Sequence, residues 1–139
     1  MTRTQLEVIF CDDVRQEIGN KQSFIGVYSG DLLIEHVPVV LPRLCVVATL
    51  TLPPGDDCDS VQFRVMQGDQ CLLRTDDLPG ASGAFSAEQD RRIAVVAVMS
   101  PFQVDDEISL HVVAELDETE LESRHLRIRR TSDDLETVQ

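Results

Sequence analysis

The sequence predicts an all-β fold, an antiparallel β-sandwich of immunoglobulin-like or C2-like appearance with about nine strands. Three observations support this prediction. Apolar and polar residues alternate with a period of two along most of the chain, as in strands that bury one face. Helical periodicity is almost absent. Turn-forming residues recur at intervals of about 8–15 residues, which is typical of sandwich domains.

The first half of the chain contains four predicted strands. Apolar alternation begins at Leu6, and the fourth strand is the longest. It is ended by the turn Pro53-Pro54-Gly55, because proline cannot continue the hydrogen-bond ladder of a sheet. The four strands are expected at residues 6–10, 22–28, 32–36 and 44–52.

The second half contains five more. The dipeptide Gly68-Asp69 is expected to join two of them in a hairpin. The run Ile93–Met99 is apolar on both faces, which predicts a central strand covered on both sides. The longest loop is expected at residues 76–90, which are rich in Gly, Ser, Ala, Pro and Asp. The five strands are expected at residues 61–65, 71–74, 93–99, 108–116 and 126–128.

Two local features interrupt this pattern near the start of the chain. A short helical turn is expected over Asp13–Ile18, capped by Asp12 or Asp13 and ended by Gly19. Gly19-Asn20 also suits a tight turn, because both residue types tolerate positive φ. Gly26 lies inside an apolar strand, which predicts a bulge or a close backbone approach.

The length and hydropathy of the chain limit its organisation. A chain of 139 residues fits one domain and buries about two thirds of its unfolded surface without a disulfide or a metal. The longest apolar run is far shorter than the ~20 residues that span a bilayer. We expect one sandwich domain over residues 1–130 and a flexible polar tail over 131–139. The start of the chain lacks the apolar segment of a signal peptide, so a cytoplasmic location is expected.

The net charge of −13, with a pI near 4.4, restricts the partners. Direct binding to nucleic acid or to an anionic membrane surface is not expected, because both depend on cationic side chains. Mutual repulsion that keeps the protein soluble is the simplest explanation of the charge. An acidic decoy that binds and blocks a basic or nucleic-acid-binding protein is the sharper alternative.

The four cysteines lie at positions 11, 45, 58 and 71. No two of them have the close spacing of a structural zinc site, and three (Cys11, Cys45 and Cys71) lie in or directly beside predicted strands. This pattern favours buried, reduced thiols in a cytosolic protein, although a disulfide between distant strands stays open.

Carboxylate pairs recur in the predicted loops. Calcium takes six to eight oxygen ligands, so carboxylates from several loops at one end of a sandwich could form a calcium-assisted binding domain. Solvated turns are the simpler interpretation, since Asp is a favoured turn residue and no EF-hand spacing is present. The groups are Asp12-Asp13, Asp56-Asp57 with Asp59, Asp76-Asp77, and Asp105-Asp106 with Glu107.

The three histidines are far apart in the sequence. His111 and His125 are expected on neighbouring strands, joined by a turn, and could face the same side. Two histidines can begin a metal site, but the sequence does not indicate a third ligand, so no metal site and no cofactor are expected. Nucleophile elbows, P-loops, dinucleotide fingerprints and zinc-protease motifs are absent. The sequence therefore predicts a protein that is not an enzyme.

One segment resembles a known family. Residues Phe10–Glu17 and Gly19–Tyr28, followed by Leu41-Pro42-Arg43-Leu44, are similar to short, uncharacterised bacterial and phage-encoded proteins defined only as a domain of unknown function. The resemblance covers the first third of the chain. It implies a β-sandwich and a phage or prophage origin, and it implies no activity.

Five charged residues of this segment are the candidate binding residues. Surface ion pairs contribute only ~0–1 kcal/mol each, so stability alone does not require such a concentration of charge. We therefore single out Asp12, Asp13, Arg15, Glu17 and Lys21.

The arginine-rich segment 124–130 is a second charged feature. It is expected to form an edge strand whose charges prevent aggregation between sheets. Alternatively, it could pair with an acidic face of an identical subunit.

The leading functional hypothesis is a non-catalytic module for protein interaction or structure, using loops or an edge strand to bind another protein. The partner is an unidentified protein or a second copy of the chain.

Overall fold

The computed structural model describes residues 3–56, 58–79 and 89–131, and these residues form an all-β structure without a helix. The strands are β1 (Gln5–Glu17), β2 (Lys21–Val27), β3 (Leu32–Ile34), β4 (Val39–Leu41), β5 (Leu44–Leu52), β6 (Ser60–Gln67), β7 (Gln70–Arg74), β8 (Leu78–Pro79), β9 (Arg91–Met99), β10 (Phe102–Val104), β11 (Ile108–Leu116), β12 (Thr119–Glu122) and β13 (Leu126–Arg130).

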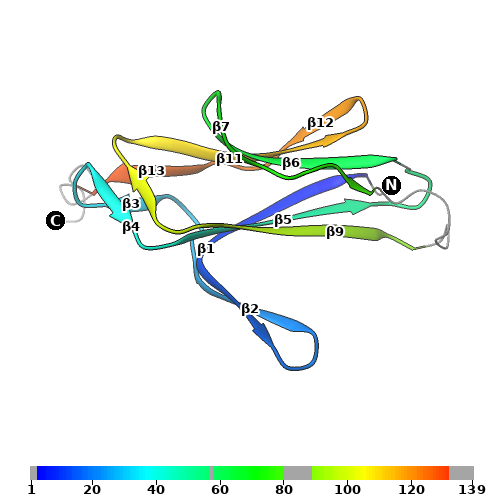
Figure 1. Cartoon of the computed structure of the whole chain (residues 1–139), viewed down its shortest axis with the longest axis horizontal. Helices are drawn as coiled ribbons and strands as arrows, with labels where there is room; N and C mark the ends of the chain where they lie inside the picture. Colours follow the sequence, from blue (N-terminus) through cyan, green and yellow to red (C-terminus); the bar gives the residue numbers. More distant parts are fainter. Residues whose placement is uncertain (1–2, 57, 80–88, 132–139) are drawn as a thin grey trace.

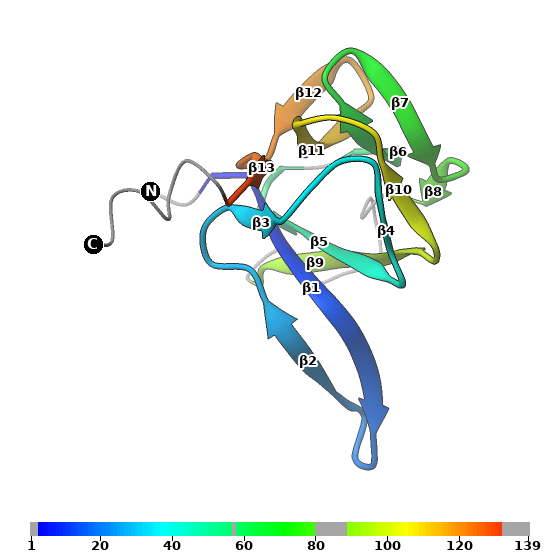
Figure 2. The same ribbon diagram turned by 90° about the vertical axis from the view of Figure 1, so that its left-hand side faces the viewer.

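The strands form two stacked sheets. Sheet A has four strands in the order β2-β1-β5-β9. Sheet B has the order β3-β13-β11-β6-β7, with β12 on β11 and β8 on β6. Figure 1 shows the two sheets as layers, and Figure 2 shows the short β4–β10 ribbon between them at one end. The predicted antiparallel β-sandwich is confirmed, with one parallel pair, β3 and β13.

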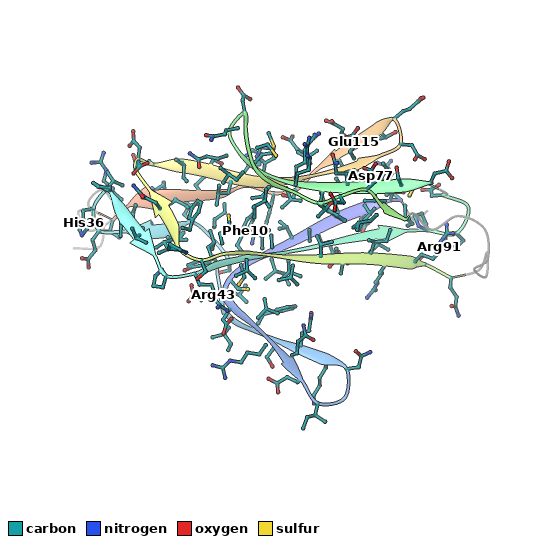
Figure 3. All side chains as sticks on the ribbon, in the orientation of Figure 1. Phe10, His36, Arg43, Asp77, Arg91 and Glu115 are labelled. Atoms are coloured by element: carbon teal, nitrogen blue, oxygen red, sulfur yellow. The ribbon has the colours of Figure 1, made fainter. Side chains whose placement is uncertain are left out.

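The hydrophobic core lies between the sheets and follows the period-two pattern. On β5, Leu44, Val46 and Ala48 point into the core and are almost fully buried. Leu110, Val112 and the residues that follow them in alternation do the same from β11. Phe10, which is 0% exposed, lies between the two layers in Figure 3. Burial of side chains of this size contributes about 1.5–3 kcal/mol each, so this alternation is what selects the sandwich.

The expected helical turn over Asp13–Ile18 is wrong. β1 continues as a strand to Glu17, paired with β2 down to Glu17 opposite Lys21. Gly19 and Asn20, with φ of 90° and 58°, form the predicted tight turn between them. Cross-strand hydrogen bonds thus satisfy the backbone that an isolated helical turn would leave mostly unpaired.

β9 differs from its predicted place at the centre of a sheet covered on both faces. It is an edge strand of sheet A, and its residues alternate between half-buried and exposed. Ile93, Val95 and Ala97 pack against the core, whereas Val96 and Val98 are 40% and 49% exposed on the outer face. In β9, apolar residues on both faces therefore mean that the outer face is apolar and exposed. No other layer of the described chain covers it.

The arginine-rich strand β13 is not the edge of its sheet, contrary to the prediction. It lies between β11 and β3, because the short strand β3 pairs with it in parallel. Four further strands, β4, β8, β10 and β12, were not expected from the sequence, since each spans only two to four residues. Segments this short carry too few alternating positions for a pattern to be recognised.

Two predictions fall outside the described residues. These are the flexibility of the tail, at 132–139, and most of the long loop, at 80–88. In the described ranges, no helix is long and apolar enough to cross a membrane.

Candidate functional site

A two-stranded arm projects from sheet A. β1 pairs with β5 only between Gln5 and Cys11, whereas its pairing with β2 runs from Cys11 to Glu17. Beyond Cys11 the hairpin therefore has no neighbouring strand on its β1 side. Figures 1 and 2 show it extending away from both layers of the sandwich. We call residues 12–26 the arm.

The outer face of sheet A carries an apolar patch at the base of this arm. Residues that pair across neighbouring strands lie on the same face of a sheet. The registers place Val27, Cys11, Cys45 and Val98 in one row across all four strands. A second row contains Ile9, Val47 and Val96. We call these seven residues the outer patch.

The outer patch combines buried and exposed side chains. Its central members Cys11, Cys45 and Val47 are at most 4% exposed, although they point away from the core between the sheets. Its flanking members Val27 and Val98 are 51% and 49% exposed. Outer-face side chains this apolar are unusual in a sheet with one solvated face, which normally alternates apolar and polar residues. The patch is therefore a candidate contact surface.

The structure places four of the five candidate binding residues on the same face as the outer patch. Asp13, Arg15 and Glu17 alternate along β1 with Cys11, and Lys21 is opposite Glu17 on β2. Asp12 points to the other face, since neighbouring residues of a strand point in opposite directions. The charged residues thus extend the outer patch along the arm, and Asp12 is separate from them.

Asp13 fixes the base of the arm. Its carboxylate accepts a hydrogen bond of 2.9 Å from Nη1 of Arg43, the residue that precedes β5, and lies 3.7 Å from Nε of Arg15. The hydrogen bond from Arg43 is the main reason why the pKa of the Asp13 carboxyl is lowered. Figure 3 shows Arg43 where the hairpin leaves the sheet. This contact joins the arm to the sandwich. Asp13 and Arg15 therefore have a structural role, although the sequence suggested a binding role for all five charged residues.

Asp12 and Gly26 form a second contact at the base, on the other face. The Tyr28 hydroxyl donates a hydrogen bond of 2.5 Å to Asp12 Oδ1. Gly26 has φ of 68°, and a Cβ built there would lie 2.2 Å from Asp12 Oδ2. The bulge or close backbone approach predicted at Gly26 takes another form: the strand register is unbroken, and the group that lies close to Gly26 is a side chain.

The tip of the arm is free of such contacts. Ile18 is 95% exposed, and neither Glu17 nor Lys21 forms an ion pair with a described residue. Ile25, opposite Asp13, is 40% exposed on the patch side of the arm. An apolar centre surrounded by charged residues is the usual composition of a protein–protein contact.

Sequence reasoning found the charged part of this surface and missed its apolar part. The sequence predicts Val96 and Val98 in a strand covered on both sides, and it predicts the cysteines only as buried thiols. The available indication was that Ile93–Met99 is apolar on both faces. That pattern does not distinguish a covered strand from an edge strand with an apolar outer face.

Cys11, Cys45 and Cys58 are buried, as predicted, whereas the exposed position of Cys71 differs from the prediction. Burial, aided by the neighbouring Cys45, raises the pKa of the Cys11 thiol to about 11, and burial also raises that of Cys45. At neutral pH both thiols are protonated and act as small apolar side chains of the outer patch.

The loop carboxylates do not form a calcium-type cluster among the described residues. An open pocket of about 820 Å³ at one end of the sandwich is lined by Asp56, Asp59 and Asp117. The Asp117 carboxylate, however, accepts hydrogen bonds from the backbone N–H groups of Asp59 and Ser60 at 3.2–3.3 Å. It therefore holds the loop between β5 and β6, and Asp57 lies outside the described residues.

His111 and His125 do share a face, as expected from the sequence. Their rings are stacked at 4.3 Å on the outer face of sheet B, remote from the outer patch. The sequence does not indicate a third ligand beside them, and the structure adds Glu122 from the end of β12.

Two comparisons with known proteins complete the description. The model of a family of unknown function, DUF6941, matches residues 7–129. No curated protein matches the chain.

Proposed function

Since the chain belongs to the DUF6941 family of unknown function, we propose its role from its own surface: it is a non-catalytic protein-interaction module. The contact surface is the outer patch together with the arm. The observation that carries the proposal is the pair of apolar rows across sheet A. Beside these rows, β1 and β2 continue into a projecting hairpin with the exposed Ile18 at its tip.

Both free edges of sheet A support this assignment. β2 and β9 are its edge strands in the described chain, so each has backbone N–H and C=O groups without a partner strand. An incoming strand can pair with such an edge while its side chains reach the apolar patch beside it. The partner is either a different protein or a second copy of this chain.

The distribution of carboxylates favours this function over the acidic decoy. A decoy needs its negative charge gathered on one face, like the phosphates of a nucleic acid. The described carboxylates are spread over the arm, both ends of the sandwich and the outer face of sheet B. Asp13, Asp56, Asp106 and Glu120 represent these four places.

A cytoplasmic location and a phage or prophage origin belong to the same proposal. Buried cysteines without the spacing of a zinc site or a secreted framework support the location, and the resemblance of residues 10–28 to phage-encoded proteins supports the origin. The genes that flank this one test the origin: phage structural or host-takeover genes support it, and an unrelated metabolic operon contradicts it.

The function is tested by comparing two surface variants as bait. Val98→Glu places a charge in the outer patch, and Val40→Glu places the same charge at a similarly exposed site on β4 (49% and 54% exposed). Both baits are incubated with an extract of the source cells, and bound proteins are compared with those on the wild-type chain. Sedimentation of each purified chain reports self-association.

We expect Val98→Glu to lose the partner, or the dimer, that wild type and Val40→Glu retain. A buried unpaired charge in a contact costs several kcal/mol, so the loss should exceed about a hundredfold in affinity. If all three chains are monomeric and bind the same proteins, the outer patch is not the contact surface.

A further inference from the structure

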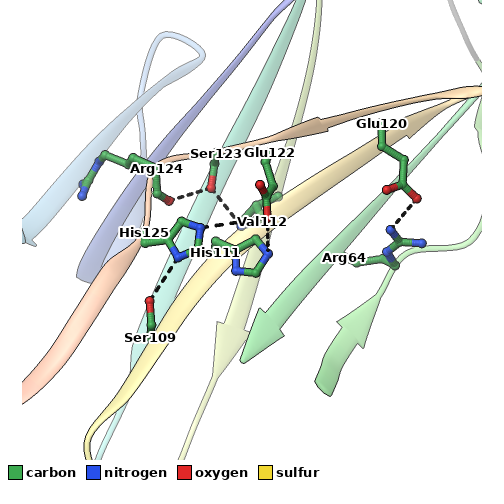
Figure 4. A network of polar contacts seen from close by, with 9 residues as sticks. All are labelled: Arg64, Ser109, His111, Val112, Glu120, Glu122, Ser123, Arg124 and His125. Carbon is green, nitrogen blue, oxygen red and sulfur yellow. Dashed lines mark hydrogen bonds and ion pairs between the residues drawn. The ribbon is translucent and has the colours of Figure 1, made fainter. Parts of the chain in front are cut away.

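The outer face of sheet B holds a compact polar group that the proposed protein contact does not use. It consists of His111 on β11, Glu122 at the end of β12, and His125 just before β13 (Figure 4). His111 is 6% exposed, one of few buried polar residues in the described chain. Buried polar side chains normally have a defined partner for each polar atom, so this group calls for an explanation.

A β-bulge brings the three side chains to one face. β12 pairs with β11 up to Val113 opposite Glu122, and β13 resumes the pairing at Leu110 opposite Leu126. Two residues of β11 are therefore spanned by three residues of the other segment, 123–125. In a regular strand, residues three apart point to opposite faces. The extra residue of the bulge removes this restriction for Glu122 and His125.

Backbone contacts hold the bulge in place. Ser123 donates its N–H to the Val112 carbonyl at 2.9 Å, and its Oγ accepts a hydrogen bond of 2.9 Å from the Val112 N–H. Ser123 Oγ also donates to the Arg124 carbonyl at 2.8 Å. Ser123 is itself buried, at 6% exposed. The positions of the side chains on either side are thus fixed by the fold.

The three side chains lie close enough to form a metal-ligand set once the two stacked rings, whose planes are 8° apart, turn toward a common point. Glu122 Oε1 lies 3.0 Å from His111 Nε2 and 4.0 Å from His125 Nε2. One potential ligand atom from each residue lies within 4.8 Å of the others. Ligands at 2.0–2.1 Å in tetrahedral geometry are about 3.3 Å apart, so movements of about 1 Å would suffice.

The surroundings of the two imidazoles suit coordination. Ser109 Oγ lies 3.1 Å from His125 Nδ1 and can accept a hydrogen bond from the Nδ1–H group. In that tautomer Nε2 carries no proton and is available to an ion. His111 Nδ1 has no hydrogen-bond partner among the described residues, so no such bond opposes a small rotation of the ring.

We propose that His111, Glu122 and His125 bind a divalent transition-metal ion of the zinc type. A set of two imidazoles and one carboxylate is typical of zinc. Calcium and magnesium prefer sets made of oxygen ligands only. The side chains of Glu122 and His125 are 63% and 47% exposed, so the fourth coordination position faces solvent and takes water or a side chain of another molecule. The inference is independent of the protein contact on sheet A.

Metal titration of the full chain tests the site. The experiment uses chain freed of metal with a chelator, in a Cys71→Ser background so that the exposed thiol does not compete. Zinc binding is measured by calorimetry and by thermal unfolding, and the absorption of bound cobalt reports nitrogen and oxygen ligands without thiolate. We expect one ion per chain, and at about a hundredfold excess over Kd a rise in Tm of about 5–15 °C.

Two histidine variants make the test specific. His125→Ala removes a half-exposed ligand at little cost to the fold and should weaken zinc binding by more than about tenfold. His36→Ala removes the histidine outside the cluster and should bind like the parent. Equal zinc affinity of the His125→Ala and parent chains overturns the proposal, as does a parent chain that binds no zinc or is stabilised equally by calcium.

Discussion

At the level of single residues, Gly26 is the position where the sequence has least freedom. Its φ of 68° is unfavourable for any residue with a Cβ, and the space where a Cβ would lie is filled by the Asp12 carboxylate. Asp12 is held there by the Tyr28 hydroxyl. The three residues together form the inner side of the arm base.

Gly26→Ala is therefore expected to destabilise the protein by about 1–3 kcal/mol. Gly30→Ala is the matched control, because a Cβ there meets nothing within 4 Å and the backbone needs no positive φ. It should change stability by less than about 0.5 kcal/mol. Urea unfolding of both variants measures the difference, and equal midpoints would show that Asp12 moves aside freely.

Thiol reactivity should separate the cysteines. Cys71 is exposed on β7, whereas Cys11 is fully buried with its pKa raised to about 11. A rise from 9.0 lowers the thiolate fraction about a hundredfold, and burial lowers access further. Iodoacetamide at neutral pH should modify Cys71 first, as followed by peptide mass spectrometry. Labelling of Cys11 at the same rate as Cys71 would contradict its buried position in the centre of the outer patch.

At the level of elements, the arm depends on one charged contact with the sandwich. Arg43 holds the Asp13 carboxylate, and the lowered pKa means that the ionised form is favoured in the folded state. The contribution of this contact is complete above the ordinary pKa of about 4. It is lost as the pH falls through the lower, folded-state pKa.

Arg43→Ala should raise the pKa of Asp13 toward its ordinary value and speed amide exchange in the arm. Carboxyl titration by NMR measures the first effect, and hydrogen exchange of β2 measures the second. Arg74→Ala, which removes an exposed arginine on β7, should leave both unchanged. An unaltered Asp13 titration in Arg43→Ala would mean that the contact is not formed in solution.

The long elements were predictable, and their neighbours were not. Alternation over five or more residues predicts β1, β2, β5, β6 and β11, because each must bury one face, and a continuous apolar run predicts β9. The prediction of a helical turn at Asp13–Ile18 is wrong because it depends on local capping residues alone, whereas this segment pairs with β2. The predicted positions of β9 and β13 in their sheets are wrong for a related reason. Which strands lie beside them depends on segments that are remote in the sequence.

The candidate sites divide in the same way. Charged residues of the arm stand out in the sequence because Asp12, Asp13, Arg15, Glu17 and Lys21 lie close together. The outer patch does not, since Val27 and Val98 meet only through the registers of sheet A. Glu122 could not be joined to the histidines either, because the bulge that turns it toward them leaves no pattern in the sequence.

At the level of the whole molecule, the two outer faces of the sandwich differ in chemistry. Sheet A presents apolar rows that continue into a projecting arm. Sheet B presents charged and histidine side chains. Arg64 pairs with Glu115 and Glu120, and Figure 4 shows its pair with Glu120 beside the two histidines. In line with the proposed function, we expect sheet A to contact another protein and sheet B to remain exposed in that complex.

Hydrogen exchange of the protein in complex with its partner, or of its own dimer, tests this claim most directly. In the free chain, the amides at the open edges of β2 and β9 should exchange quickly. We expect binding to slow exchange in β2, β9 and the arm, and to leave exchange in the edge strands β3 and β7 of sheet B unchanged. Protection confined to β3, β7 or the β12–β13 segment would contradict it.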